Sequence, residues 1–149
     1  MSPDALRSLT LLHGIVSWLE ALLLVTLCAL LFRKGGLDKP FSWRLPVSAT
    51  FGAITSFASG MGLELHYRVH LRQRLFITSK TLGWLFERKL HLSFGLFMFA
   101  AIGLLALFLA RKDPRFFSAM RHAYGLATAC ALITCVISTI VRIARPLGN

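Results

Sequence analysis

The 149-residue sequence predicts an all-α fold, in which residues 1–149 form one integral membrane domain, an antiparallel four-helix bundle. Hydrophobic residues make up 56% of the chain, more than a soluble domain of this length usually carries. They lie in four long runs that are almost free of charge, and Lys or Arg residues flank the runs. Because about 20 apolar residues form a helix that crosses roughly 30 Å of hydrocarbon, each run is a predicted span.

The four predicted spans cover residues 8–32, 45–65, 90–110 and 119–141. The first is longer than the ~7–15 apolar residues of a signal peptide, so we expect it to stay in the membrane. The second is thinner, with many Ser, Thr, Gly and Ala residues. The third is the cleanest, bracketed by Lys89 and Arg111, and the fourth ends at Arg142.

Four spans place both termini and the segment 66–89 on one side of the membrane, called side A. The connections 33–44 and 111–118 then lie on the opposite side, side B. Lys and Arg residues are divided almost evenly between the two sides. The positive-inside rule therefore leaves the orientation open, although the short basic connections lean towards a cytoplasmic side B.

The net charge of +11 is explained by basic residues that flank membrane spans and meet lipid phosphates. No nucleic-acid-binding motif interrupts the apolar runs, so the expected partner is the lipid bilayer and not RNA or DNA. Cys28, Cys130 and Cys135 fall inside the spans without a Cys-x-x-Cys pair. They are expected to pack as small apolar residues, which argues against a thiol-redox enzyme.

The segment 66–89 combines arginines with apolar and aromatic residues, among them Trp84. This composition suits a basic amphipathic helix in the headgroup layer, anchored by the indole. The same residues also fit a continuation of the second helix beyond the bilayer, or a docking surface. The sequence leaves these alternatives open.

Small residues recur every fourth position along the second span, at Ser48, Gly52, Ser56 and Gly60. On a helix they form one smooth groove that lets a neighbouring backbone approach closely. The groove fits close helix packing, and it also fits a flat ligand such as a porphyrin or a quinone.

The histidines are the first candidate site residues. His13, His66, His70 and His91 lie towards side A, whereas His122 lies near side B. A b-type haem needs imidazoles from different helices in an apolar slot. We therefore expect His13 and His91 to be the axial ligands of the haem iron, with His66 and His70 as further cofactor-binding residues. The competing interpretation is that these histidines contact lipid headgroups.

A family resemblance follows from short motifs around three of these histidines. The stretch from Leu90 to Leu96, LHLSFGL, is similar to the start of a helix in small bacterial membrane cytochromes of the b561 type. Leu12-His13 heading an apolar run, and Arg121-His122 at the start of the fourth span, also resemble that family. The resemblance implies a four-helix bundle in the bacterial inner membrane that carries haem b and exchanges electrons with quinone.

Glu20 is the candidate catalytic residue, because a carboxyl group near the middle of a span is costly unless it has a use or a partner. It follows His13 by seven residues and so lies on nearly the same helix face. It fits a proton relay, a quinone contact or a structural hydrogen bond, and it is expected to face the bundle or a subunit interface. Glu64 is placed to orient an imidazole or to pair with Arg68.

Three functions therefore remain open. The first is a haem b electron-transfer subunit that works with quinone and other membrane subunits. The second is a haem-free accessory subunit of a multisubunit complex. The third is a small transporter or membrane enzyme.

Overall fold

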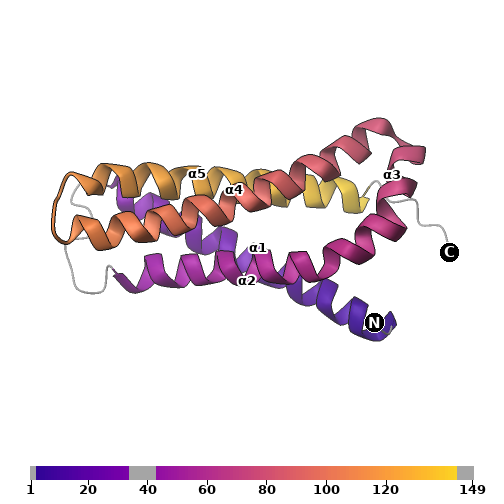
Figure 1. Ribbon diagram of the computed structural model, residues 1–149, viewed down its shortest axis with the longest axis horizontal. Coiled ribbons are helices and arrows are strands. Elements are labelled where there is room, and N and C mark those ends of the chain that lie inside the picture. Colours follow the sequence, from indigo (N-terminus) through magenta and orange to yellow (C-terminus); the bar gives the residue numbers. More distant parts are fainter. Residues whose placement is uncertain (1–2, 34–42, 144–149) are drawn as a thin grey trace.

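The structure, a computed structural model, describes residues 3–33 and 43–143, and within these ranges it contains helices and no strands. Four long helices make up most of it (Figure 1). They are α1 (Pro3–Phe32), α2 (Arg44–Tyr67), α4 (Lys80–Ala110) and α5 (Phe116–Ile143). A π-helical turn, η2 (Arg68–Arg72), and a short helix, α3 (Gln73–Thr78), follow α2 without a break.

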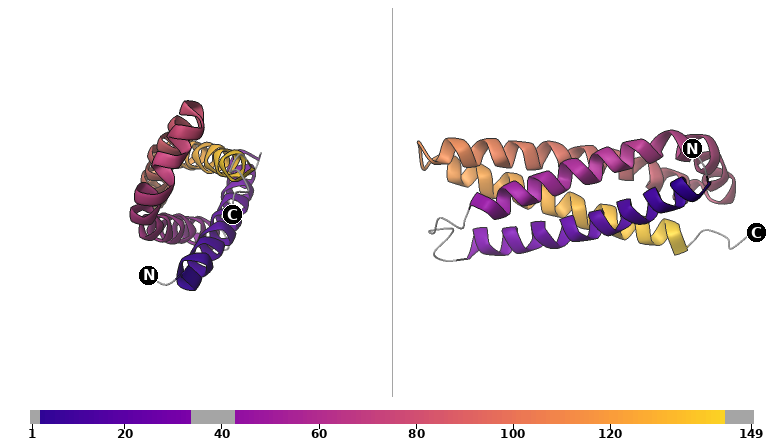
Figure 2. Two further views of the ribbon diagram at one scale, coloured as in Figure 1. Left: turned by 90° about the vertical axis from the view of Figure 1, so that its right-hand side faces the viewer. Right: turned by 90° about the horizontal axis from the view of Figure 1, so that it is seen from below.

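The long helices run antiparallel around a ring, as an end-on view shows (Figure 2). α1 packs against α2 and α5, and α4 packs against the same two helices from the other side of the ring. The start of α1 and the end of α5 lie at the end of the bundle where α3 meets α4, and the turn between α4 and α5 lies at the opposite end (Figure 1). The predicted sides A and B are therefore the two ends of the bundle, although most of the connection 33–44 lies outside the described residues.

The segment 66–89 forms a helical hairpin. The chain stays helical from α2 through η2 and α3 to Thr78. It reverses direction at Ser79, which has extended backbone angles, and α4 begins at Lys80. α4 thus begins ten residues before the predicted start of the third span. The second helix thus continues past Tyr67, whereas the depth of this hairpin relative to the bilayer stays a prediction. A π-helical turn locally disturbs the regular α-helical ladder, which accounts for the bend where α2 becomes α3 (Figure 1).

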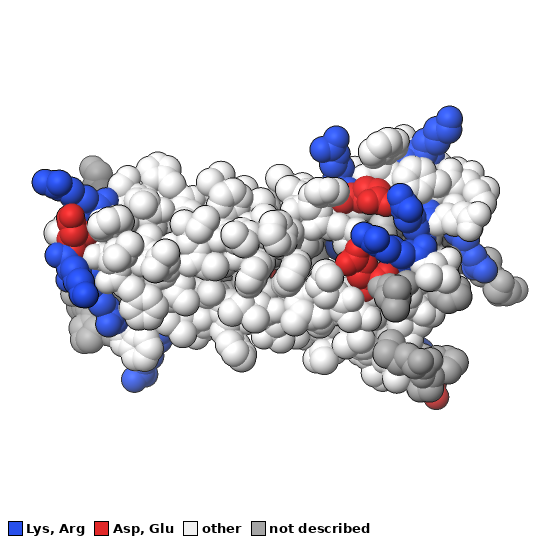
Figure 3. All heavy atoms as spheres, viewed as in Figure 1, with Lys and Arg blue, Asp and Glu red and all other residues white. Residues whose placement is uncertain are grey.

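Three of the described helices, α1, α4 and α5, are long and apolar enough to cross a membrane. α2 has 24 residues, but its many small and hydroxyl-bearing residues lower its hydropathy. Lys and Arg residues gather at the two ends of the molecule and leave an uncharged surface between them on the face in view (Figure 3). The structure thus agrees with an all-helical membrane protein, with three helices rather than four identified as candidate spans.

The side B half of the bundle is closed by a hydrogen-bonded network around Tyr124 of α5, which has no exposed surface. Its hydroxyl group lies 3.0 Å from Thr50 Oγ1 and donates to the carbonyl oxygen of Pro46 at 3.2 Å. Thr50 Oγ1 also lies 3.3 Å from the carbonyl oxygen of Ala100 in α4. Gly103 gives the tyrosine ring its space, because a Cβ atom there would lie 2.8 Å from the ring. This network joins α2, α4 and α5.

Candidate functional site: a polar cavity in the side A half

The side A half of the bundle contains a partly open cavity of about 1370 Å³, lined by residues of α1, α2, α4 and α5 and by Arg74 of α3. Most of the lining is apolar, and the polar residues concentrate on one stripe of α1 and on the facing helices. Those that matter for its chemistry are His13, Ser17, Glu20, Ser56, His66, Thr134 and Cys135. The cavity therefore combines a hydrocarbon-like wall with a few polar groups, as small-molecule sites in proteins commonly do.

The predicted ladder of small residues on α2 packs against the polar side chains of α1, namely His13, Ser17 and Glu20. A Cβ atom at Gly52 would lie 3.6 Å from Glu20 Cβ, and one at Gly60 would lie 3.1 Å from His13 Cε1. Between them, the hydroxyl oxygens of Ser17 and Ser56 lie 2.9 Å apart in a hydrogen bond. The ladder thus serves close helix packing, and Ser48, its first member, is exposed.

His13 is oriented by two serines of α2. Its Nδ1 atom lies 2.9 Å from Ser59 Oγ, and the hydroxyl group of Ser59 donates its proton to the carbonyl oxygen of Ser56 at 3.0 Å. Since that proton is already used, Ser59 Oγ must accept the proton on Nδ1 of His13. In the neutral imidazole, Nε2 then keeps an unshared electron pair for a proton donor or a metal ion.

Glu20 is buried inside the bundle, with 2% of its surface exposed. Its Oε1 atom has no hydrogen-bond partner among the described residues. The same is true of Thr134 Oγ1 on α5, and both residues line the cavity. A buried polar atom without a partner costs about 1–3 kcal/mol. Both atoms have almost no accessible surface, so a polar ligand or a water molecule in the cavity would reach them only if these side chains move.

The end of the cavity nearest side A is basic. Arg7, Arg74, Lys89 and Arg142 contribute to its lining there, together with His66 and Glu64. Glu64 accepts a hydrogen bond from Arg68 Nε at 2.9 Å, which is the pairing expected from their spacing. The side chain of His70 lies outside the described part of the chain.

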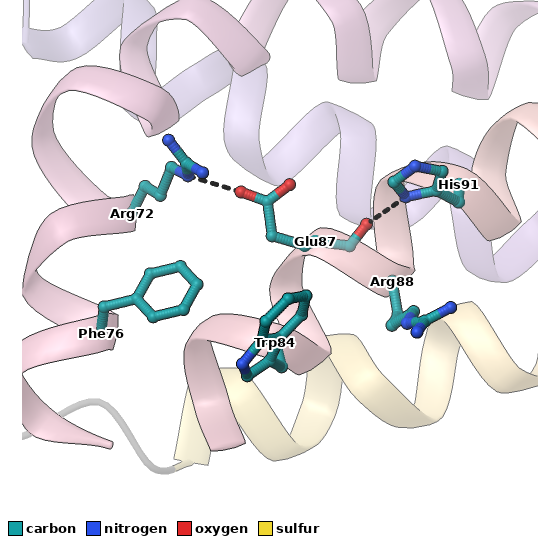
Figure 4. A pocket seen from close by; sticks show the side chains of 6 residues that line it. All are labelled: Arg72, Phe76, Trp84, Glu87, Arg88 and His91. Atoms are coloured by element: carbon teal, nitrogen blue, oxygen red, sulfur yellow. Dashed lines mark hydrogen bonds and ion pairs between the residues drawn. The ribbon is translucent and has the colours of Figure 1, made fainter. Parts of the chain in front are cut away.

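The structure does not bring His13 and His91 to one cavity. His91 lies on the outer side of α4, where it lines a separate pocket beside α3 (Figure 4). His122 lies at the other end of the bundle, exposed, with Nδ1 2.7 Å from the carbonyl oxygen of Ser118. Among the described residues, no group of three or more His, Cys, Asp or Glu side chains is arranged to hold a metal ion. Ligation of a haem iron by His13 and His91 stays a prediction.

Two residues that shape this site, Thr134 and Ser59, were not predicted from the sequence. Thr134 is one of several hydroxyl-bearing residues in apolar runs, and nothing in its neighbourhood marks it as facing a cavity. Ser59 lies next to the predicted ladder but one position off it. A search for polar residues one helix turn from Ser56 would have pointed to Ser59.

No family model, no curated protein and no solved structure matches this chain.

Proposed function

We propose that this protein binds the ring of a quinone in the side A cavity and serves as a small membrane subunit of an electron-transfer assembly. The observation that supports it is the pair of buried, unpartnered oxygens, Glu20 Oε1 and Thr134 Oγ1, on two walls of one largely apolar cavity. A quinone presents two oxygens on an apolar ring. Its carbonyl oxygen can accept the hydroxyl proton of Thr134, and the hydroxyl group of the reduced form can donate to Glu20.

His13 extends this chemistry. Its Nε2 atom is a proton acceptor, and Ser17 lies between it and Glu20 on α1. Oxidation of a bound hydroquinone releases two electrons and two protons. In this proposal Glu20 and His13 accept the protons, and the electrons leave through a partner subunit that holds the redox centre.

The tail of the quinone has a path to the lipid. Leu11, Ile15, Trp18 and Leu22 recur at helical spacing along α1; they line the cavity and are also exposed on the outside of the helix. An isoprenoid chain lying across this face stays in contact with hydrocarbon while the ring is held inside. Such a side entry suits a ligand that diffuses within the bilayer.

The proposal treats α2 as the fourth span. Between Arg44 and Glu64 the helix carries no charged residue, so its uncharged length matches that of its neighbours. Three of its polar side chains face the bundle: Ser56 and Ser59 contact α1, and Thr50 contacts Tyr124. Ser48 and Thr55 are exposed, and Thr55 donates its hydroxyl proton to the carbonyl oxygen of Phe51 in its own helix. A bacterial inner membrane is also part of the proposal, and it rests on the resemblance of the histidine motifs alone.

Haem b is a second candidate for the same cavity, favoured by the orientation of His13. A metal-bound imidazole commonly donates its other nitrogen to a neighbouring group, as Nδ1 of His13 does to Ser59. His13 would hold the iron, which supplies one-electron transfer, and the arginines at the side A end would pair with the propionates. An absorption spectrum of the reduced protein without a haem band rules this candidate out.

The quinone proposal is tested by the purified protein in mild detergent. We expect solvent extraction to recover a quinone, and a short-chain quinone to bind again after its removal. Glu20→Leu and Thr134→Val should each weaken binding about tenfold, because each removes one hydrogen bond to a buried group. Thr26→Val is the matched control, because Thr26 is exposed and donates to the carbonyl oxygen of its own helix at Leu22.

Equal quinone affinity in all three variants would contradict the proposed site, and recovery of no quinone with no rebinding would favour an accessory subunit without a ligand. A further readout is turnover of the whole assembly. Glu20→Gln should slow it across the pH range while leaving any haem spectrum unchanged. Unchanged turnover would show that the carboxyl group of Glu20 is structural.

A further inference from the structure

A second pocket lies on the outside of the bundle, in the corner between α3 and the start of α4 (Figure 4). Its volume is about 470 Å³. Six residues line it: Arg72, Phe76, Trp84, Glu87, Arg88 and His91. It is separate from the side A cavity, and the quinone proposal makes no use of it.

The pocket carries positive charge that its own residues do not fully neutralise. Arg72 donates from Nε to Glu87 and lies over the Phe76 ring, 5.8 Å from its centroid. This leaves the other N–H groups of its guanidinium group available. Arg88 is exposed and forms no ion pair with any residue that the structure describes. The two arginines and one carboxylate give the pocket a net charge of +1.

The orientation of His91 adds a further polar contact. Its Nδ1 atom lies 2.9 Å from the carbonyl oxygen of Glu87 and must donate to it, because a carbonyl oxygen only accepts. The Nε2 atom is left for another partner. The Phe76 and Trp84 rings are neighbours in Figure 4 and meet edge to face, with their centroids 6.3 Å apart and their planes at 74°. The pocket thus combines charged side chains with an aromatic wall.

The depth of the pocket matches the headgroup layer. α4 carries no charged residue between Lys89 and Arg111, which is about the length that crosses the hydrocarbon. The pocket lies just outside this stretch, with Trp84 61% exposed. An exposed indole next to basic side chains is the usual composition of a membrane interface.

The face of α4 that bears the pocket continues into the membrane as an apolar strip. Trp84, Arg88 and His91 are followed at helical spacing by Phe94, Met98 and Ile102, all exposed. One helix face therefore offers a cationic site at the interface and a hydrophobic path below it. A molecule with an anionic head and a hydrocarbon tail is complementary to both parts.

We propose that this pocket binds an anionic phospholipid of the side A leaflet. Arg88 and Arg72 hold the phosphate group, and the acyl chains lie along the strip from Phe94 to Ile102. Basic pockets at the ends of membrane helices recognise phospholipid headgroups in this way. Arginine suits the task, because its planar group forms two parallel hydrogen bonds with phosphate oxygens.

The test uses the full chain in nanodiscs of phosphatidylcholine, with and without phosphatidylglycerol. Bound lipid is counted by native mass spectrometry after release from the disc. We expect phosphatidylglycerol to be retained in preference to phosphatidylcholine. Arg88→Gln should reduce its retention about tenfold, whereas Lys80→Gln, on the same hairpin but outside the pocket, should leave it unchanged.

Two outcomes of the retention experiment overturn the proposal. One is equal retention of both lipids by the natural protein, a result that needs no variant. The other is an equal effect of Arg88→Gln and Lys80→Gln, which would indicate general attraction to the basic end of the bundle. Inorganic phosphate distinguishes the source of the anion. If it displaces the lipid at matched concentration, the pocket is a site for free phosphate and the lipid proposal fails.

Discussion

Gly103→Ala tests whether the Tyr124 network locks the side B half of the bundle. The added Cβ atom would lie 2.8, 2.9 and 3.0 Å from three carbon atoms of the Tyr124 ring, whereas carbon atoms pack best at about 3.5–4.0 Å. The ring cannot retreat freely, because its hydroxyl group is bonded to Thr50 and to the Pro46 carbonyl oxygen. A shift of the ring large enough to relieve the contact also weakens these bonds.

The magnitude follows from two opposing contributions. Overpacking a filled core costs about 1–3 kcal/mol, and the strained hydrogen bonds place this site in the upper part of that range. Replacing glycine by alanine inside a helix raises the free energy of unfolding by about 0.8–1.0 kcal/mol. We therefore expect Gly103→Ala to lower the free energy of unfolding by about 1–2 kcal/mol.

The assay is reversible unfolding in mixed micelles, followed by circular dichroism. Gly14→Ala is the matched control, because a Cβ atom at Gly14 meets nothing within 4 Å and should bring the helical gain alone. In a Tyr124→Leu background the clash disappears, so Gly103→Ala should become neutral or stabilising. The reasoning is refuted if Gly103→Ala is as stable as Gly14→Ala, or if the Tyr124→Leu background changes nothing.

Three further predictions concern other parts of the chain. Gly83→Ala places a Cβ atom 2.5 Å from the Phe76 ring, so it should open the α3–α4 hairpin and speed proteolysis there while the bundle melts as before. Gly60→Ala places a Cβ atom 3.1 Å from the His13 ring, so it should displace the ring and weaken ligand binding several-fold without unfolding the protein. Unchanged ligand binding would show that the added methyl group fits without displacing His13. A spin label at Phe51, which is exposed on α2, should be reached by oxygen in the lipid and not by a water-soluble relaxation agent; the reverse would show that α2 does not span.

The long helices could be predicted from the sequence, because charged residues mark the ends of membrane spans and can be read directly from the sequence. Every predicted span lies within a long helix, and the ladder on α2 was recognisable from its spacing of four. Glu20 was expected to avoid lipid because a carboxyl group in hydrocarbon needs a polar environment, and it is buried in the bundle.

The hairpin and the shape of the site could not be predicted in the same way. Alternating Arg and Leu residues in 66–89 fit a headgroup helix as well as an extended α2, and neither pattern shows that α3 folds back onto α4. The position of His91 depends on the rotation of α4 about its own axis. Lys89 and Leu90 line the cavity, whereas His91, one position later, points outside.

The two halves of the bundle differ in their packing, so the surroundings of Glu20 are polar towards side A and apolar towards side B. Around Glu20 the polar lining leads through Ser17 and His13 towards side A, while the opposite direction is filled by packed apolar residues and by the ring of Tyr124. In the proposed quinone site, Glu20 would therefore exchange protons with the side A end of the bundle, and protons taken from a bound hydroquinone would leave towards that end.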